Sequence, residues 1–440
     1  MSPSLASALT VAACVICVDH SALANGRYPS AGQIAEDPAD PQHWLARTTY
    51  GFLQSVDARQ SWQWICEASV GYDGQEDPFV GITANGSIVA TTTQGLSVSQ
   101  DRGCTWRKAA APEWLGRLPA VDLAVDPRQP SRVVVLATAQ DQAKHQLFES
   151  LDNGASWHSL GQPLPDGAHG LTLEIAPSLP SRIYVSARAG ADFETHLLLR
   201  TDDGGATWLE RPFALPALDA RGAPLPADQT QVLGTYIGAV DPLAPDTVWL
   251  RVLRFQPDQL WRTMDGGLTW QRVFEAKQGK LVSFALSPDG TQVAVGGTGA
   301  DPGVWRSATA TLGWSRAGPI GASCLKWTAT GLFACADETT DGMTIGQSTD
   351  GGAHFSPVHH RSDLTQLQCP TGTRTALLCP KVWPLTAYNL GLDTAPPAAA
   401  ATPAPRGCSA GLPTTTAGIG GWILLACLAV LSMGSRRLPW

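Results

Sequence analysis

Two short acidic segments hold the residues of this sequence that are best suited to binding a ligand. They are Asp73, Glu76 and Asp77 in GYDGQEDP, and Asp192, Glu194 and His196 in ADFETH. Carboxylates grouped on one loop can hydrogen-bond the hydroxyls of a sugar or bind a cation. The same groups are also common on the solvated surface of an acidic protein, and this 440-residue chain has a formal net charge of -8.

The wider sequence carries no signature of a metal, a cofactor or a nucleic-acid partner. The adjacent histidines His359 and His360 would point to opposite faces of a strand. None of the six cysteines from Cys66 to Cys379 has a C-x-x-C or Cys/His spacing typical of zinc. Nucleic-acid binding depends on clustered cations, and the sequence contains no run of Lys or Arg. We therefore expect no metal, no cofactor and no nucleic-acid partner.

The elements that would position a site are set by a repeated phrase, Ser/Thr-x-Asp-x-Gly-x-x-Trp. Clear copies are SQDRGCTW at 99–106, SLDNGASW at 150–157, TDDGGATW at 201–208, TMDGGLTW at 263–270 and STDGGAHF at 348–355. Two weaker copies stay in register, SVDARQSW at 55–62 without the glycine and SATATLGW at 307–314 without the aspartate. The segments between copies alternate apolar runs with Pro, Asp or Gly, which is the pattern of β-hairpins. Seven phrases and seven hairpins predict seven four-stranded units, each a propeller blade.

The position of the first and last repeats predicts how the ring closes. The first phrase, at Asp57, has no hairpin before it, and the last hairpin, Leu364 to Cys379, has no phrase after it. We therefore expect the two ends of the chain to share one blade, which removes open sheet edges. An even number of cysteines in this region of an exported protein predicts disulfides. The pairs expected from this closure are Cys66–Cys104, Cys324–Cys335 and Cys369–Cys379.

The phrases resemble the Asp-box, or BNR, repeats of sialidases, sortilin-type receptors, some glucanases and the photosystem assembly factor propellers. The resemblance covers Ser55 to Cys379. It implies an all-β fold, a seven-bladed β-propeller in which each Asp-box is a hairpin turn between the third and fourth strands. Such turns lie on the outer rim, away from the central channel, so the phrase fastens the fold and is not expected to be a repeated ligand site.

Each residue type of the phrase has an expected structural role. The aspartate accepts backbone N–H bonds inside the turn, the glycine supplies a positive φ and the tryptophan packs between blades. The residues assigned these roles are Asp57, Asp101, Asp152, Asp203, Asp265 and Asp350; Gly103, Gly154, Gly205, Gly267 and Gly352; and Trp62, Trp106, Trp157, Trp208, Trp270 and Trp314. The strand leading into each turn carries a large apolar residue four positions before the anchor, as at Phe148, Leu199, Trp261 and Trp305.

The resemblance also defines what a catalytic member would need. A sialidase needs an arginine triad and a tyrosine nucleophile backed by a glutamate, but the Arg-Ile-Pro signature is absent and the corresponding region reads LARTTYGF. Only Tyr236, on an inner strand, is placed to line the channel, with Glu174 as the carboxylate that would face it. Glucanases of this type usually carry two propellers and a pair of aspartates. The alternative function is therefore a sialidase- or glucanase-like glycoside hydrolase that uses acidic residues of the central cleft.

The two ends of the chain indicate export and anchoring. An apolar run at residues 5–18 followed by Ala22-Leu23-Ala24 predicts a signal peptide over residues 1–24. Val11 to Cys14 also resembles a bacterial lipobox, in which Cys14 would be lipidated. A Pro/Ala-rich linker over 391–407 precedes a final segment, 408–440, that contains eighteen nearly uncharged residues and then Arg436-Arg437, the pattern of a transmembrane helix.

This C-terminal order looks like the sorting signals of myxobacterial surface proteins. That resemblance implies that Cys408 is the anchoring residue and that the transmembrane helix is temporary. An ordinary single-pass anchor is the alternative. In both cases the propeller, predicted over residues 25–390, is expected to face the outside of the cell envelope.

The sequence as a whole favours a secreted, surface-anchored, monomeric propeller without catalytic activity. We expect it to bind or scaffold a protein or glycan at the mouth of the channel, where the loops Asp73 to Phe79 and Leu215 to Thr235 converge. Long loops on a rigid scaffold are where recognition residues are usually found.

Overall fold

The computed structural model describes residues 27–394 except Asp73, 110–118, 138–144, 217–222, 224–230, Gln256 and Gln278. The predicted signal peptide at 1–24, Cys408 and the apolar segment after it lie outside the described residues. In the part of the chain that the structure describes, no helix has both the length and the hydrophobicity to cross a membrane.

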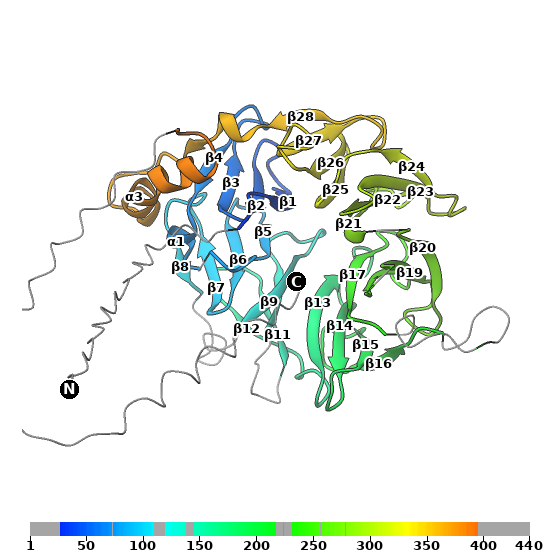
Figure 1. Cartoon of the computed structure of the whole chain (residues 1–440). Coiled ribbons are helices and arrows are strands. Elements are labelled where there is room, and N and C mark those ends of the chain that lie inside the picture. The colour runs from blue at the N-terminus through cyan, green and yellow to red at the C-terminus, as the bar shows by residue number, and fades with distance from the viewer. Residues whose placement is uncertain are drawn as a thin grey trace, which may run out of the picture. The chain divides into compact units, whose positions relative to one another are not determined.

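Twenty-eight of the strands form seven four-stranded antiparallel sheets, drawn in Figure 1. The first three sheets contain β1 (Ala31–Glu36), β2 (Trp44–Thr48), β3 (Gly51–Ser55) and β4 (Gln63–Ile65); β5 (Val80–Ile82), β6 (Ile88–Thr92), β7 (Gly95–Ser99) and β8 (Arg107–Lys108); and β9 (Ala120–Val125), β10 (Val133–Ala137), β11 (Gln146–Ser150) and β12 (His158–Leu160).

The remaining four sheets follow in chain order. They contain β13 (His169–Ile175), β14 (Ile183–Ala189), β15 (Thr195–Thr201) and β16 (Leu209–Phe213); β17 (Gly234–Val240), β18 (Val248–Leu253), β19 (Gln259–Thr263) and β20 (Gln271–Glu275); β21 (Lys280–Leu286), β22 (Gln292–Thr298), β23 (Gly303–Ala308) and β24 (Ser315–Gly318); and β25 (Cys324–Thr328), β26 (Gly331–Cys335), β27 (Ile345–Ser348) and β28 (Ser356–His359).

The seven sheets are the blades of a closed propeller. The first strand of each sheet contacts the first strand of the next, and β25 of the seventh sheet contacts β1 of the first. Figure 1 shows these first strands nearest the centre of the ring. The prediction of an all-β, seven-bladed propeller is therefore confirmed.

The hydrophobic cores lie between the blades because both faces of each sheet are covered. In β10 every residue from Val133 to Ala137 is buried. Val133 and Val135 pack in the cluster shared with the second blade, while Val134 and Leu136 pack in the cluster shared with the fourth. Side chains alternate between the two faces of a strand, so a continuous apolar run is what a sheet buried on both faces requires.

Hydrogen bonds between neighbouring blades tie them to one another. In most of them a polar side chain of one blade binds backbone at the start of the next. They join Gln33 Nε2 to Val80 O (3.0 Å), Leu173 N to Asp122 Oδ2 (2.9 Å), Ile237 N to Thr172 Oγ1 (2.9 Å), Leu281 N to Asp258 Oδ2 (3.0 Å), Ser283 Oγ to Ala322 O (2.8 Å) and Ser323 Oγ to Ala31 O (2.7 Å). The bond from Ser323 to Ala31 joins the seventh blade to the first and so helps to close the ring.

The predicted closure by a blade shared between the two chain ends is wrong. The first blade is complete within residues 31–65, because β1 and β2 supply the hairpin that the sequence pattern did not reveal before Asp57. The segment Leu364 to Cys379 is not a hairpin. It forms the short strand β29 (Thr365–Gln366), which pairs in parallel with β4, and then the start of helix α3 (Arg374–Asn389).

The apolar residues of α3 explain why this segment is helical despite Pro380 and Pro384 inside it. Cys379, Trp383 and Leu390 lie on one face at helical spacing and pack against the core of the first blade. Tertiary packing of that face outweighs the poor helix propensity of proline.

All six expected cysteines form disulfides, but two of the three predicted pairings are wrong. Cys324–Cys335 is confirmed, and it joins the neighbouring strands β25 and β26. The pairs Cys66–Cys104 and Cys369–Cys379 do not form; the bridges are Cys66–Cys379 and Cys104–Cys369. Because α3 lies beside the short helix α1 (Glu67–Val70), Cys379 reaches Cys66 at the start of α1.

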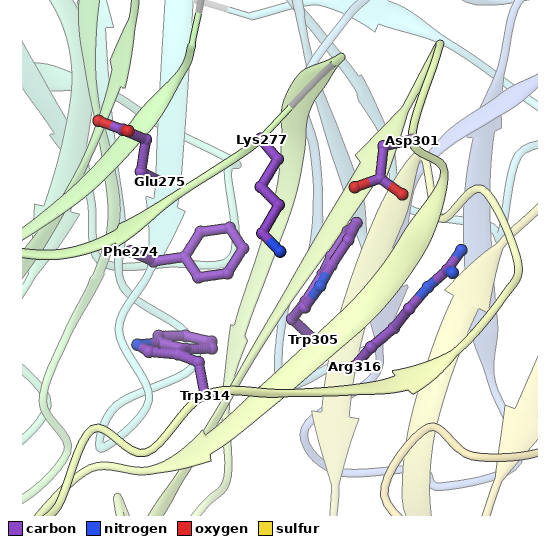
Figure 2. Close-up of a pocket in the computed structure, with 7 residues that line it drawn as sticks. All are labelled: Phe274, Glu275, Lys277, Asp301, Trp305, Trp314 and Arg316. Atoms are coloured by element: carbon purple, nitrogen blue, oxygen red, sulfur yellow. The ribbon is translucent and has the colours of Figure 1, made fainter.

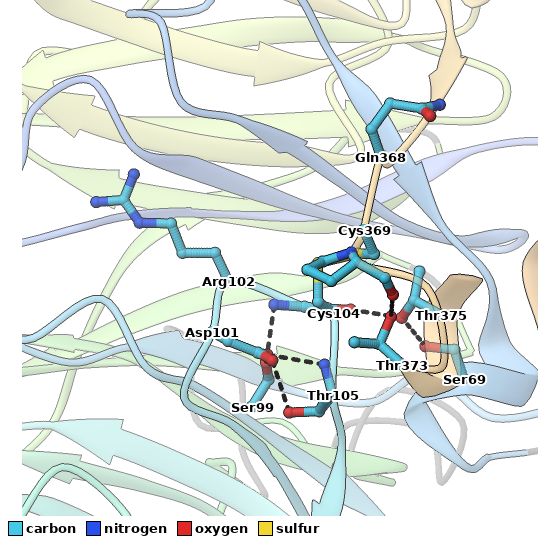
Figure 3. The surroundings of a disulfide bond; sticks show 12 residues. Ser69, Ser99, Asp101, Arg102, Cys104, Thr105, Gln368, Cys369, Thr373 and Thr375 are labelled. Atoms are coloured by element: carbon cyan, nitrogen blue, oxygen red, sulfur yellow. Dashed lines mark hydrogen bonds between the residues drawn. A yellow bond between two sulfur atoms is a disulfide. The ribbon is translucent and has the colours of Figure 1, made fainter. Parts of the chain in front are cut away.

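The second long-range bridge binds the C-terminal segment to the second blade, as Figure 3 shows. Cys369 is joined to Cys104, which lies in the repeated turn of that blade. Thr375 N donates to Cys104 O (3.1 Å), and the hydroxyls of Thr375 and Ser69 lie 2.6 Å apart. The segment from Leu364 to Asn389 is called the C-terminal strap below, since it runs from the seventh blade across the first to the second.

Candidate functional site

The aspartates of the repeated turns form hydrogen bonds within the turns themselves. In six of the seven turns, the hydroxyl two residues before the aspartate donates to its Oδ1 at 2.7–2.9 Å. The same Oδ1 accepts the main-chain N–H four residues later at 2.8–3.0 Å. Figure 3 shows one example, in which Ser99 and Thr105 bind Asp101. The turn of the sixth blade has Thr309 in place of the aspartate, and the Thr309 hydroxyl binds Gly290 O instead (2.8 Å).

These turns join each blade to the one before it. The turn glycines Gly103, Gly154, Gly205, Gly267 and Gly352 all have φ between +81° and +96°. Trp157 packs in the core shared by the second and third blades, and Trp314 packs beside the core shared by the fifth and sixth. Hydrogen bonds from Thr207 and Thr201 lower the pKa of Asp203 to about 2. Such a carboxylate stays ionised at neutral pH, but its oxygens are already occupied by the turn.

The innermost strands carry a separate group of charged residues at the centre of the ring. Asp122, Glu174, Lys326 and Glu36 belong to β9, β13, β25 and β1 respectively. Burial and, to a smaller extent, the neighbouring charge of Asp122 raise the pKa of Glu174 to about 8, while Lys326 opposes the shift. Burial lowers the pKa of Lys326, against the attraction of Glu36 and Glu174. Residues of blades that are not neighbours thus influence one another across the channel.

Asp122 is used as a link between blades. Its Oδ1 accepts a hydrogen bond from Leu123 N and its Oδ2 accepts one from Leu173 N, both at 2.9 Å. Burial raises the pKa of Asp122 to about 7, although these two N–H groups act in the opposite direction. Burial therefore gives both Asp122 and Glu174 a pKa near or above 7. Both carboxyl oxygens of Asp122 are bound to backbone N–H groups.

The raised pKa of Glu174 predicts a loss of stability at alkaline pH. The folded chain keeps this proton up to about pH 8, whereas the unfolded chain releases it near pH 4. The folded state therefore binds more protons between these values, and the free energy of unfolding falls as pH rises through this window. We expect Glu174→Gln to raise the thermal midpoint relative to wild type by about 3 °C more at pH 9 than at pH 5.

Thermal melts followed by circular dichroism at the two pH values test this expectation. The exposed Glu194→Gln is the matched control, and its profile should run parallel to that of wild type. A Glu174→Gln profile that is also parallel to wild type would show that ionisation of Glu174 does not oppose folding.

The acidic segment around Asp77 serves the fold. Asp77 forms ion pairs with Arg27 (2.6 Å) and Arg47 (2.9 Å). The Glu76 carboxylate accepts hydrogen bonds from the N–H and the hydroxyl of Thr93, both at 2.8 Å. These contacts hold the start of the described chain against the first two blades, while Asp73 is outside the described residues.

The second acidic segment does not form a combined site. Asp192 and Glu194 are exposed on the loop before β15, whereas His196 is buried, with Nε2 3.3 Å from Val232 O. Most of the loop predicted at Leu215 to Thr235 lies outside the described residues. Among the residues with described positions, no group of three or more His, Cys, Asp or Glu side chains is arranged to hold a metal ion.

The predicted pairing of Tyr236 with Glu174 receives no support from the contacts of either residue. Tyr236 lies opposite Arg251 in the pairing of β17 with β18, and its ring lies beside Gly234. The charges that shift the pKa of Glu174 come from Asp122 and Lys326. His359 is buried against Trp62, while His360 binds Glu338 (3.0 Å), so these two histidines also lie apart.

A pocket of about 440 Å³ lies between the fifth and sixth blades, where no site was expected from the sequence. Its volume falls in the range of about 300–1,000 Å³ that is usual for small-ligand pockets. The residues that line it, shown in Figure 2, are Phe274, Glu275, Lys277, Asp301, Trp305, Trp314 and Arg316. Trp305 and Trp314 were expected only to pack between blades. The turn sequence of the sixth blade, SATATLGW, is the single copy without its aspartate, and it supplies Trp314.

Three aromatic rings form one side of this pocket. The Phe274 ring lies 4.8 Å from Trp314 and 5.8 Å from Trp305, centre to centre. The Arg316 guanidinium lies 5.8 Å from the centre of the Trp305 ring and donates a hydrogen bond to Pro302 O. This is the geometry of a cation–π contact, which holds Trp305 in place.

Some charged groups of the pocket have hydrogen-bond or ion-pair partners in the protein, and others have none among the described residues. Glu275 Oε2 accepts hydrogen bonds from Gln259 Nε2 and from Arg272 Nη1, both at 2.7 Å. Among the described residues, neither the Lys277 ammonium nor the Asp301 carboxylate makes a hydrogen bond or an ion pair. Lys277 is on the connection from β20 to β21 and Asp301 is on the loop between β22 and β23. Because strands alternate in direction, both loops lie at the end of the blades opposite the repeated turns.

Comparison with known proteins finds partial similarities and does not assign the chain to a family. No protein-family model matches the chain. A curated xyloglucanase from Paenibacillus sp is 26% identical over 227 residues, which are 46% of this chain and 21% of that enzyme. This chain therefore spans about a fifth of the enzyme it matches.

Solved structures support the fold alone. The crystal structure of an ancestral GH74 enzyme aligns with a TM-score of 0.50 and 13% identity, over 76% of this chain and 46% of that chain.

Proposed function

We propose that this propeller is a non-catalytic recognition module that binds a polysaccharide in the pocket between its fifth and sixth blades. The observation that carries the proposal is the combination of three aromatic rings with two uncompensated polar groups, Lys277 and Asp301. A sugar ring has apolar C–H faces that pack on aromatic rings and hydroxyls at its edge that need hydrogen-bond partners. The xyloglucanase similarity supports a saccharide as the class of ligand.

The repeated turns and the ends of the chain support a setting at the cell surface. The turns have the sequence and hydrogen bonds expected of Asp-boxes, and we include that assignment in the proposal. Three disulfides favour a protein that folds outside the reducing cytoplasm. An exported propeller anchored through residues 408–440 would present the pocket to extracellular polysaccharide.

A glycoside hydrolase is the second candidate function. It is favoured by Glu174, because a carboxyl group that remains protonated near neutral pH is what a general acid needs. A hydrolase also needs a second carboxylate as base or nucleophile. The neighbouring Asp122 has both oxygens bound to backbone N–H groups, which makes it a poor candidate for that role.

A binding assay combined with a hydrolysis assay separates the two functions. The full chain is applied to an array of plant and bacterial polysaccharides that includes xyloglucan, and the same polysaccharides are then incubated with it and analysed for new reducing ends. We expect binding to at least one polysaccharide without release of reducing ends. Release that is abolished by Glu174→Gln would establish the hydrolase instead, and the absence of both binding and release would remove both candidates.

A further inference from the structure

We infer that the pocket between the fifth and sixth blades selects an acidic saccharide, one whose sugar ring carries a carboxylate. This inference rests on the proposed function, since it names the class of saccharide that the same pocket would bind. It follows from which charges around the pocket are neutralised and which are left for a ligand.

The pocket is locally positive although the chain is acidic overall, with a net charge of -8. Lys277 and Arg316 bring two positive charges, and Glu275 and Asp301 bring two negative ones. Glu275 is neutralised from outside the pocket, because Arg272 forms an ion pair with it at 2.7 Å. The remaining charges favour a ligand with a negative group.

The direction of Lys277 fits such a ligand. In Figure 2 its side chain extends toward the space between Phe274 and Trp305. An ammonium in this position would bind a carboxylate through a charge-assisted hydrogen bond while the sugar ring rests on Trp305. Asp301, on the neighbouring loop, can only accept hydrogen bonds when ionised, so it suits the hydroxyl groups of the same sugar.

A carboxylate fits better than a phosphate group. A phosphate monoester carries nearly two negative charges at neutral pH, whereas a carboxylate carries one. The Arg316 guanidinium is already engaged with the Trp305 ring and Pro302 O. Lys277 is therefore the cation left for the ligand, and as a single point charge it matches one carboxylate.

The test compares acidic oligosaccharides with their neutral methyl esters, which share the same backbone. Tetramers of galacturonate, glucuronate and mannuronate are titrated into the full chain by calorimetry, each as the free acid and as the ester. We expect at least one acid to bind about ten times more tightly than its ester. Lys277→Gln should abolish this preference, so that the variant binds acid and ester equally, and Lys277→Arg should retain it.

The controls separate failure of this inference from failure of the proposed function. Lys381→Gln, an exposed lysine on α3 outside the pocket, should leave the preference unchanged. Equal affinity for acid and ester, a preference that persists in Lys277→Gln, or tighter binding of a sulfated neutral tetramer would overturn the inference and leave polysaccharide binding intact. Absence of binding to these oligomers and to the whole array would overturn both.

Discussion

Removing both disulfides of the C-terminal strap is expected to lower the free energy of unfolding by about 9 kcal/mol. Cys66–Cys379 and Cys104–Cys369 join residues 313 and 265 positions apart. Each bridge therefore restricts a very long loop of the unfolded chain, and the entropic stabilisation grows with the length of that loop. The loss is comparable with the whole stability of a typical domain, about 5–15 kcal/mol.

Each bridge contributes less while the other one remains, and the two contribute about equally in that case. If Cys104–Cys369 remains, the loop closed by Cys66–Cys379 shrinks to about 50 residues, and its loss costs about 4 kcal/mol in the same entropic account. Cys324–Cys335 spans only 11 residues and should contribute about 3 kcal/mol. Pairs of Cys→Ala substitutions are compared by their thermal midpoints, with about 10 °C expected for loss of both strap bridges.

The ranking of the destabilisation caused by each disulfide loss tests whether the strap holds the ring closed. Loss of both strap bridges should be several times more destabilising than loss of Cys324–Cys335. An equal or smaller effect would mean that the strap does not hold the ring closed, and that the hydrogen bond from Ser323 to Ala31 and the packing of β25 on β1 suffice.

Gly161→Ala is expected to destabilise the protein by about 3 kcal/mol or more, because its methyl group would overlap the next blade. A Cβ at Gly161 would lie 2.2 Å from the carbonyl carbon and oxygen of Gly205, the turn glycine of the fourth blade. Gln162 N donates to the same carbonyl at 2.7 Å, so the two backbones cannot separate without losing this bond.

Gly167→Ala is the matched control for this substitution. Gly161 has φ of +60° and Gly167 has φ of +76°, so both substitutions place alanine in a left-handed conformation that costs about 1 kcal/mol. Gly167 has no atom within 4 Å of the added Cβ, and its variant should therefore lose only that amount. Equal unfolding free energies of the two variants in denaturant titrations would contradict the close docking of the turn on the preceding blade.

The propeller could be predicted from the sequence because the same turn phrase and the same apolar strand pattern occur seven times. The turn phrase fixes its own geometry through contacts within a few residues, such as those of Ser99 and Thr105 with Asp101. The runs between the phrases, such as Val133 to Ala137, are apolar on both faces because each sheet is covered on both sides. In every repeat, the hydrogen bonds within the turn and the alternation of side chains along the strands indicate the blade structure.

The closure of the ring could not be predicted in the same way because it depends on contacts between distant residues. The strap resembled a hairpin in composition, and Pro380 and Pro384 argued against a helix. Only packing of Trp383 on the first blade and the bridge from Cys379 to Cys66 fix its structure. These two cysteines are 313 residues apart, which no local pattern can reveal.

The pocket was missed for a related reason. Its seven residues come from β20, β23, β24, the repeated turn before β24 and two loops, and no recognisable sequence motif joins its charged residues. Trp305 and Trp314 occupy positions where other blades carry core residues, such as Leu199 and Trp208. The missing aspartate in SATATLGW was the one departure from the repeat near this site.

Titration of oligosaccharides into two tryptophan variants tests the central claim most directly. Trp305→Leu removes an aromatic ring from the pocket and introduces the residue that the fourth blade carries at the equivalent position, Leu199. Trp261→Leu makes the same change at the equivalent position of the fifth blade, in the core outside the pocket. We predict at least about a tenfold loss of affinity for Trp305→Leu, or about 1.4 kcal/mol, and unchanged affinity for folded Trp261→Leu. Unchanged binding by Trp305→Leu, or an equal loss in both variants, would contradict recognition at this pocket.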